Sequence, residues 1–288
     1  MFIIHHFPCG GPSISGTILT KHAIRRFRRV VLDNYRLHRC EFPWRQTADP
    51  YRIFVSEIML QQTQTDRVLP KYEEFVAAFP DFASVADAPQ KEILQAWQGL
   101  GYNRRALALK KSAEIVERDY RGLLPASADK LLALPGVGKY TAAAVLAFAF
   151  NQPVVFIETN IRAAFIHHFF ADRSDVRDAE IVPLVEQTVD RSNPREWYYA
   201  LMDYGVVLKK THRGVGRRSA HYQRQSRFAG SNRQLRGRVL KLLLGRPGVT
   251  ARALARELCA DAERLRKVLD EMKAEGFVEG TRGRYRVV

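Results

Sequence analysis

Cysteine is scarce in this chain of 288 residues, which contains only Cys9, Cys40 and Cys259. The three are far apart, which argues against a disulfide framework and a cysteine-rich metal site and favours a reducing cytoplasm. Long apolar runs are also missing, since no stretch reaches the roughly 18 apolar residues of a membrane span. The N-terminal residues lack a basic start followed by an apolar core, so they do not predict a secretory signal. These absences exclude secreted disulfide scaffolds and membrane proteins.

Acidic residues are missing from one long segment, although the whole chain has 46 Lys and Arg against 30 Asp and Glu. From Gly205 to the C-terminus there are 21 basic and 7 acidic residues, and between Lys209 and Arg256 there are 14 basic residues and no acid. Because charges of both signs normally alternate on a solvated surface, this block favours a polyanion as partner. A basic tail that only aids solubility is the alternative.

Strand-like alternation is almost absent before residue 277, whereas apolar residues recur at helical spacing along most of the chain. The spacing predicts an all-α core with short loops. Asp49 followed by Pro50 marks the start of a helix that we expect to run to Gln64. The helices expected in the core are residues 21–39, 50–64, 68–79, 83–86, 90–98, 104–119, 128–134, 139–150, 160–170, 178–190 and 195–208.

The pattern changes near the C-terminus. Helices are expected at 234–244, 250–258 and 261–275, followed by short strands at 277–280 and 284–287 around a turn with glycine. Three helices and a hairpin form the winged-helix pattern, which often binds DNA and in other proteins mediates protein contacts. The expected segments are an N-terminal tail at 1–20, a helical core at 21–208, a basic linker at 209–233 and a winged-helix-like domain at 234–288.

The strongest motif is LPGVGKYTA, residues 134–142. Its two glycines allow a sharp turn and leave backbone N–H groups accessible at the start of the next helix. Such an N-terminus suits a phosphate, so the motif predicts a helix-hairpin-helix element that grips the DNA backbone without reading its sequence. A plain tight turn between helices is the alternative. The residues expected at the backbone are Leu134, Gly136, Val137, Gly138, Lys139 and Thr141.

Together with four further strings, this motif resembles the helix-hairpin-helix base-excision DNA glycosylases related to endonuclease III, and among them the adenine glycosylases of the MutY type. The other strings are FPWR (42–45), SEIMLQQTQ (56–64), GLGYNRRA (99–106) and MDYG (202–205). The resemblance covers about Phe42 to Leu208, and SEIMLQQTQ is the string that points to the adenine branch. It implies two helical lobes around a cleft and double-stranded DNA as partner.

Cleavage of the N-glycosidic bond of a purine needs a proton on the leaving base and negative charge beside the developing sugar cation. Glu57 lies in an otherwise apolar helix segment, where burial would raise its pKa and keep a proton available. The resemblance makes Glu57 the general acid, Glu158 the stabiliser of the cation and Asn160 a residue that orients it. The family normally has Asp-Gly where this chain has Glu158 and Thr159, which leaves the geometry and the preferred base open.

Tyr140 predicts the type of reaction. Members of the family that also nick the strand have a lysine at this position, which forms a Schiff base, and a tyrosine cannot form one. We therefore expect a monofunctional enzyme that leaves an abasic site. The resemblance also implies a wedge that enters the duplex while the base is flipped, made of Gln61, Gln62 and Tyr102, and a base pocket with Trp44 and Arg45. A polar helix end and a core tryptophan are the alternatives.

In the family, four cysteines after the MDxG string hold an iron–sulfur cluster. The corresponding residues here are Lys209, Gly216, Ser219 and Gln225. We expect no cluster, no metal site and no other cofactor, and a monovalent cation at the hairpin is the only ion left open. Adenine-specific relatives usually carry a Nudix-like domain where this chain has the expected winged helix.

The sequence thus predicts a monofunctional, clusterless DNA glycosylase that removes adenine opposite 8-oxoguanine or guanine in base excision repair. We expect it to be monomeric, cytoplasmic and associated with the nucleoid. Two alternatives stay open. One is a glycosylase for another base, such as mismatched thymine or uracil, hypoxanthine or an alkylated purine, and the other is a non-catalytic DNA-binding protein on a glycosylase scaffold.

Overall fold

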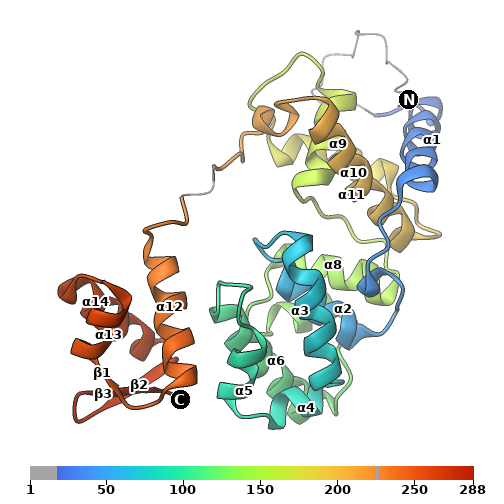
Figure 1. Cartoon of the computed structure of the whole chain (residues 1–288). Coiled ribbons are helices and arrows are strands. Elements are labelled where there is room, and N and C mark those ends of the chain that lie inside the picture. Colours follow the sequence, from blue (N-terminus) through green and yellow to red (C-terminus); the bar gives the residue numbers. More distant parts are fainter. Residues whose placement is uncertain (1–17, 225–226) are drawn as a thin grey trace. The chain divides into compact units, whose positions relative to one another are not determined.

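The computed structural model of the chain describes residues 18–224 and 227–288. Most of it is helical, and a small antiparallel sheet lies near the C-terminus (Figure 1). The expected all-α core with a C-terminal α+β module is therefore confirmed. The core elements are α1 (Lys21–His38), η1 (Pro43–Arg45), α2 (Pro50–Leu60), α3 (Thr65–Ala78), α4 (Phe82–Asp87), α5 (Gln90–Ala96), α6 (Arg104–Tyr120), α7 (Ala128–Leu132), α8 (Lys139–Phe150), α9 (Thr159–Phe169), α10 (Asp178–Thr188), α11 (Pro194–Thr211) and η2 (Val215–Arg218).

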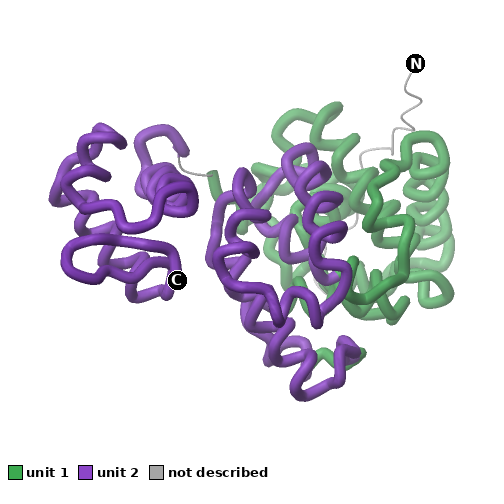
Figure 2. Tube along the Cα trace, turned by 60° about the horizontal axis from the view of Figure 1, so that its bottom comes forward, with its two compact units in different colours: residues 1–53, 126–128, 138–224 green, residues 54–125, 129–137, 225–288 purple. Residues whose placement is uncertain are grey.

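The chain forms two compact units, which Figure 2 draws in green and purple. The first unit comprises residues 1–53, 126–128 and 138–224, and the second comprises residues 54–125, 129–137 and 225–288. The chain thus passes between the units several times, and each is described by itself below. Among the helices that the structure describes, none is both long and apolar enough to cross a membrane.

The first unit has Phe27 of α1 at its centre. The centroid of this ring is 5.1 Å from those of Phe165 and Phe169 on α9 and 5.9 Å from that of Trp197 on α11. α8 is almost wholly apolar, and nearly every residue from Thr141 onward is buried, as expected for a helix that is hydrophobic all round. The unit is therefore a bundle in which α9 and α11 form the central pair.

α9 and α11 approach each other most closely at Gly205. An ideal Cβ on Gly205 would lie 2.1 Å from the backbone oxygen of Asn160, far inside van der Waals contact. Glycine weakens a helix interior by leaving the backbone more freedom in the unfolded chain, so its presence within α11 needs a local reason. The reason is that the backbone of α11 at Gly205 lies directly against the backbone of the first turn of α9, which leaves no room for a side chain.

The second unit is organised around Trp97, directly after α5. Its ring packs edge-on against Phe75 of α3, with 5.9 Å between the centroids, and its indole Nε1 donates to the carbonyl of Gly101 at 3.3 Å. α6 packs against α4 and α5. The buried tryptophan therefore fixes the course of the loop that leads from α5 into α6.

The C-terminal module, residues 232–288, belongs to the second unit. Its elements are α12 (Asn232–Gly245), β1 (Val249–Thr250), α13 (Ala251–Leu258), α14 (Ala262–Ala274), β2 (Val278–Thr281) and β3 (Arg284–Val287). The antiparallel sheet has the order β1-β3-β2. Arg282 and Gly283 join β2 to β3 with positive φ values of 51° and 71°, the conformation that a two-residue hairpin turn requires.

Most ends of the expected helices and strands shift by one to three residues, and two details differ more. α2 ends at Leu60 rather than Gln64, because Gln62 has a φ of 54°, in the left-handed region that cannot continue a helix. β1 is an additional strand of two residues, which was not expected because a strand so short shows no alternation of its own. Asp49 accepts from the N–H of Tyr51 at 2.9 Å, so the expected cap at the start of α2 is confirmed.

We expect Gly205→Ala to lower the free energy of unfolding by about 2 kcal/mol, since the new methyl group must push the two helices apart. Urea unfolding followed by circular dichroism measures the loss. Gly237→Ala on α12 is the matched control, because a Cβ there meets no described atom within 4 Å, and it should be neutral or stabilising. Equal stability of Gly205→Ala and wild type would contradict the close approach.

Candidate active site

The LPGVGKYTA segment forms the expected turn between α7 and α8. Gly136 has a φ of 77°, and a Cβ there would lie 2.7 Å from the Cβ of Ala108, so only glycine fits. The hydroxyl of Ser112 donates to the carbonyl of Pro135 at 2.9 Å. Gly138 then stands at the N-cap of α8, where it has no side chain to cover the first N–H groups. Of the other predicted backbone-binding residues, Lys139 is exposed, whereas Leu134, Val137 and Thr141 are buried.

Glu57 lies in the middle of α2 and is only 4% exposed. Its neighbours along the helix, Val55 and Ile58, are fully buried as well. The expected burial of Glu57 is confirmed. α2 ends three residues later, and the amide of Gln61 donates from Nε2 to the carbonyl of Gly136 at 3.0 Å. One predicted wedge residue is thereby tied to the hairpin turn.

Arg105 joins the other segments of this region. Its guanidinium donates from Nη1 to the carbonyls of Ile58, Met59 and Gln61 at 3.0, 2.6 and 2.7 Å. It also donates from Nη2 to the hydroxyl of Thr63 and the carbonyl of Gly101, both at 3.0 Å. Burial lowers the pKa of Arg105 to about 10, which leaves it charged at neutral pH. A buried cation therefore satisfies the carbonyls at the end of α2, which have no partner within their own helix.

Tyr102, the third predicted wedge residue, lies on the turn that Arg105 holds. Its φ of 46° is unusual for a residue other than glycine. The carbonyl of Tyr102 accepts from Nε of Arg105 at 3.3 Å, and the guanidinium carbon lies 5.6 Å from the ring centroid. Gln61 and Tyr102 are thus held by the same side chain.

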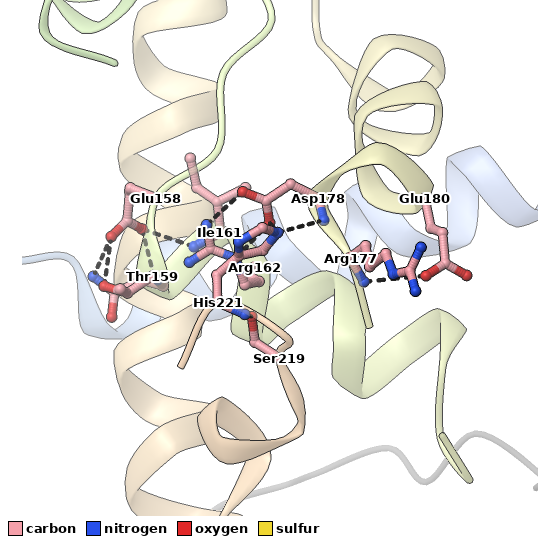
Figure 3. Close-up of polar contacts among 10 residues, drawn as sticks. Glu158, Thr159, Ile161, Arg162, Arg177, Asp178, Glu180, Ser219 and His221 are labelled. Carbon is pink, nitrogen blue, oxygen red and sulfur yellow. Dashed lines mark hydrogen bonds and ion pairs between the residues drawn. The ribbon is translucent and has the colours of Figure 1, made fainter. Parts of the chain in front are cut away.

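Glu158 is the N-cap of α9 (Figure 3). Its Oε1 accepts from the backbone N–H groups of Asn160 and Ile161, both at 2.7 Å, and its Oε2 accepts from Nδ2 of Asn160 at 3.2 Å and from the hydroxyl of Thr159 at 3.1 Å. All four contacts are donors to the carboxylate, as an anion requires. Thr159, which stands where the family has glycine, therefore contributes a hydrogen bond to Glu158.

Tyr140 follows the N-terminus of α8 and is half-buried. Its ring packs edge-on against Phe156, with 5.7 Å between the centroids, on the segment that leads to Glu158. Tyr140, Glu158 and Asn160 belong to the first unit, whereas Glu57 belongs to the second.

Trp44 and Arg45 form an aromatic and ionic cluster in the first unit. Trp44 is 3% exposed and stacks on Phe42 with 4.9 Å between the centroids. Nη1 of Arg45 forms an ion pair of 2.8 Å with Asp203, and its guanidinium lies 4.7 Å from the ring centroid of Tyr199. The FPWR and MDYG strings are therefore partners in the fold, an arrangement that sequence reasoning missed. Their role beside a flipped base stays a prediction.

The residues at the family's cluster positions do not fit an iron–sulfur cluster. Lys209, Gly216 and Ser219 supply an ammonium, no side chain and a hydroxyl where thiolates are needed, and the structure of Gln225 lies outside the described residues. In the part of the chain that is described, no group of three or more His, Cys, Asp or Glu side chains could hold a metal ion.

Polar contacts hold the segment that contains these positions. Ser219 pairs with Val176 in a short parallel bridge, and Nε of Arg218 donates to the carbonyl of Arg173 at 2.8 Å. Beside the bridge, Arg162 of α9 forms two hydrogen bonds of 2.6 and 2.7 Å with Asp178 (Figure 3). Burial raises the pKa of Asp178, but the hydrogen bonds and the charge of Arg162 outweigh it, so the net shift is downward.

We expect Arg105→Lys to lower the free energy of unfolding by about 2 kcal/mol, because an ammonium cannot reach the end of α2 and the Gly101–Tyr102 turn together. Urea unfolding provides the measurement. Arg118→Lys, at the exposed end of the same helix, is the control and should unfold at nearly the urea concentration of the wild type. If both variants were equally stable, Arg105 would not hold this region together.

Comparisons with known proteins identify relatives of this chain. Residues 55–182 match the family model described as HhH-GPD superfamily base excision DNA repair protein. The chain is 33% identical over 263 residues to the adenine DNA glycosylase of Mycolicibacterium smegmatis, with 84% of this chain and 89% of the relative covered. It is 34% identical over 187 residues to the enzyme of the same name from Buchnera aphidicola, of which it spans only 52%. A thymine/uracil-DNA glycosylase of Methanothermobacter thermautotrophicus is 32% identical over 186 residues, covering 63% of this chain and 84% of that protein.

Two solved structures are similar. A thermostable thymine-DNA glycosylase has a TM-score of 0.57 and 30% identity, covering 64% of this chain and 86% of that one. An endonuclease III, solved as a trapped covalent intermediate with DNA, has a TM-score of 0.52 and 22% identity, covering 68% and 88%, and supports the fold alone. Through the mycolicibacterial relative above all, the chain belongs to the HhH-GPD superfamily of base excision DNA repair proteins and, within it, to the family of the adenine DNA glycosylases.

Proposed function

We propose that this protein is a monofunctional adenine DNA glycosylase that acts on mispaired adenine in double-stranded DNA. The relationship to an adenine DNA glycosylase over most of both chains is the observation that carries the proposal. The buried Glu57 on α2, with Gln61 fastened to the hairpin turn, agrees with it. The opposite base that we propose is 8-oxoguanine or guanine.

In the proposed mechanism, the protein first binds the DNA backbone at the hairpin and flips the adenine out of the duplex. The carboxyl group of Glu57 gives its proton to a ring nitrogen of the adenine. The bond between the base and C1′ then breaks, and its electron pair leaves with the base. In this step Glu57 acts from a buried position in the middle of α2.

Glu158 acts on the sugar in the second half of the reaction. Breaking the bond leaves a cation at C1′ and the ring oxygen, which a fixed negative charge stabilises. The four donors around Glu158 hold its carboxylate in one orientation, so little reorganisation is needed when the cation forms. A water molecule adds to C1′, and its released proton returns to the carboxylate of Glu57, which leaves an abasic site and restores the general acid.

In this scheme no side chain of the protein forms a covalent bond to the sugar. Tyr140, at the position where strand-nicking members of the family have a lysine, cannot form a Schiff base. We also propose that the enzyme needs no iron–sulfur cluster, since the residues at the cluster positions cannot supply thiolates. As a separate part of the proposal, the enzyme works as a monomer and is associated with the nucleoid.

A second candidate is a thymine or uracil glycosylase. Two observations favour it, namely the relative and the solved structure with those names, and the pair Glu158-Thr159 in place of Asp-Gly. A change beside the sugar can accompany a change of base, so the substrate must be measured.

We expect the protein to release adenine from duplexes with A opposite 8-oxoguanine or G, and to leave sites that break only after alkali. The test incubates the protein with these duplexes and with duplexes that contain T or U opposite G, or hypoxanthine. Gel electrophoresis before and after alkali, and borohydride to trap a Schiff base, report the products. Glu57→Gln should bind DNA like wild type and release no base.

Each other outcome would replace the proposal. Release of T or U alone would support the second candidate. Strand breaks without alkali, or a trapped covalent complex, would show lyase chemistry. Absence of release from every duplex, with equal DNA binding by wild type and Glu57→Gln, would indicate a binding protein on a glycosylase scaffold.

Glu158→Gln should lower the rate of base release about 100-fold or more, because it removes the charge that faces the sugar cation. Its amide oxygen can still accept from the N–H groups of Asn160 and Ile161, so the free energy of unfolding should change by less than about 1 kcal/mol. Single-turnover kinetics and urea unfolding measure the two effects. Glu158→Asp is the control that keeps the charge, and a wild-type rate in Glu158→Gln would reduce Glu158 to a helix cap.

A further inference from the structure

The C-terminal module contacts the turn that carries the predicted wedge residue Tyr102. Arg233, in the first turn of α12, places its guanidinium carbon 5.4 Å from the centroid of the Tyr102 ring. The same guanidinium donates from Nη1 to the hydroxyl of Tyr102. Both residues belong to the second compact unit. The ring therefore interacts with Arg105 from α6 and with Arg233 from the module.

An ion-pair cluster of Arg104, Arg236, Glu271 and Glu275 holds α12 beside this turn. Glu275, at the end of α14, accepts from Nε and Nη2 of Arg104 at 2.7 and 2.5 Å and from Nη2 of Arg236. Arg236 also bonds Glu271 at 3.2 Å. The hydrogen bonds from Arg104 are the largest cause of a lowered pKa at Glu275, so this carboxyl group is charged at neutral pH.

The pair of Arg236 and Glu275 within this cluster is more than an ordinary surface contact. The side chains of Arg236 and Glu275 are only 19% and 18% exposed, so water and salt screen their interaction less than in exposed pairs. Gln90 of α5 adds a neutral contact from its Nε2 to the carbonyl of Gly276 at 2.8 Å. Arg236 lies three residues, about one helical turn, after Arg233, so both arginines lie on the same side of α12.

The use of α14 also bears on what the module can do with DNA. In a winged helix, the third helix is the one that commonly enters a groove of DNA. Here the C-terminal part of that helix presents Glu271 and Glu275 to arginines, and phosphates would repel two carboxylates. α14 therefore fixes the module beside α6 through Glu275. Arg233 of α12 is the residue of the module that contacts the ring of Tyr102.

We infer that Arg233 is a positioning residue for Tyr102, supplied by the C-terminal module and held in place by the ion-pair cluster. The inference rests on the proposed function, since it assumes that Tyr102 enters the duplex. A backbone with positive φ restricts where the ring can point, and the cation above the ring and the hydrogen bond to its hydroxyl restrict it further. An ordered ring enters the base stack with less loss of conformational entropy.

The experiment measures base unstacking without base release. The full-length chain with Glu57→Gln is bound to a duplex that carries 2-aminopurine next to the mispaired adenine, at saturating protein concentration. Arg233→Ala should lower the fluorescence gain on binding about threefold or more, and Arg233→Lys should restore part of it. Arg238→Ala is the matched control, because it removes an exposed positive charge from the same helix. Equal signals from Arg233→Ala and Arg238→Ala would overturn the inference, and so would a higher signal from Arg233→Ala.

Glu275→Gln provides a second test, because it removes a negative charge whereas Arg233→Ala removes a positive one. Removing a negative charge should strengthen general DNA binding, whereas loosening the ion-pair cluster should weaken insertion of Tyr102. In the Glu57→Gln chain, we therefore expect that adding Glu275→Gln lowers the fluorescence gain and leaves the Kd for DNA unchanged or lower. Circular dichroism checks that the variant is folded. A wild-type fluorescence gain would show that the cluster does not position Arg233.

Failure of this inference and failure of the proposed function can be told apart. If the parent chain with Glu57 releases adenine while Arg233→Ala and Arg238→Ala behave alike, the inference falls and the proposed function stands. If no duplex releases adenine but the fluorescence pattern is as expected, the proposed substrate falls and the role of Arg233 stands.

Discussion

The buried guanidinium of Arg105 is the interaction on which the predicted DNA-inserting region depends. α2 must end abruptly for Gln61 to reach the hairpin, and an abrupt end leaves backbone carbonyls inside the protein without partners. Arg105 satisfies three of them and binds the Gly101–Tyr102 turn with the other arm of its planar fork. Two segments separated by about forty residues thereby keep a constant spacing, which a point-charge ammonium could not impose. The lowered pKa of Arg105 reflects the cost of burying a cation in this region.

The same interaction explains where sequence reasoning succeeded and where it failed on the fold. Residues 139–150 were predicted as a helix with the observed bounds, because an Ala-rich apolar run between Gly138 and the left-handed Asn151 contains all its own signals. The end of α2 was predicted four residues too late, because Gln61–Gln64 have no helix breaker and the cause lies in Arg105 on another helix. Local patterns determine helices, whereas distant partners determine some of their ends.

Motif strings located the candidate site residues without giving their partners. The family resemblance placed Arg45 in a base pocket, but only the fold reveals its ion pair with Asp203 of the MDYG string. In the sequence Thr159 is only a departure from the family's glycine, and in the structure its hydroxyl donates to the carboxylate of Glu158. Gly205 has no chemical role of its own, yet it lets α11 press against the backbone of Asn160. Spacing along a chain predicts which residues share a face of one helix. It is a much poorer guide to which residues of different segments come into contact.

The basic block from Lys209 to Arg256 shows how a count of charges can mislead. Several of its arginines are already used inside the protein: Arg218 donates to the carbonyls of Phe170 and Arg173, Arg236 pairs with Glu271 and Glu275, and Arg246 pairs with Glu257. A paired or carbonyl-bound guanidinium releases few counterions on meeting a phosphate, so the electrostatic contribution to DNA binding must come from the remaining exposed residues. Part of the charge excess therefore stabilises the fold, at two places. In the loop around η2 it secures the polypeptide where the family has a metal cluster, and in α12 it secures the module that brings Arg233 to Tyr102.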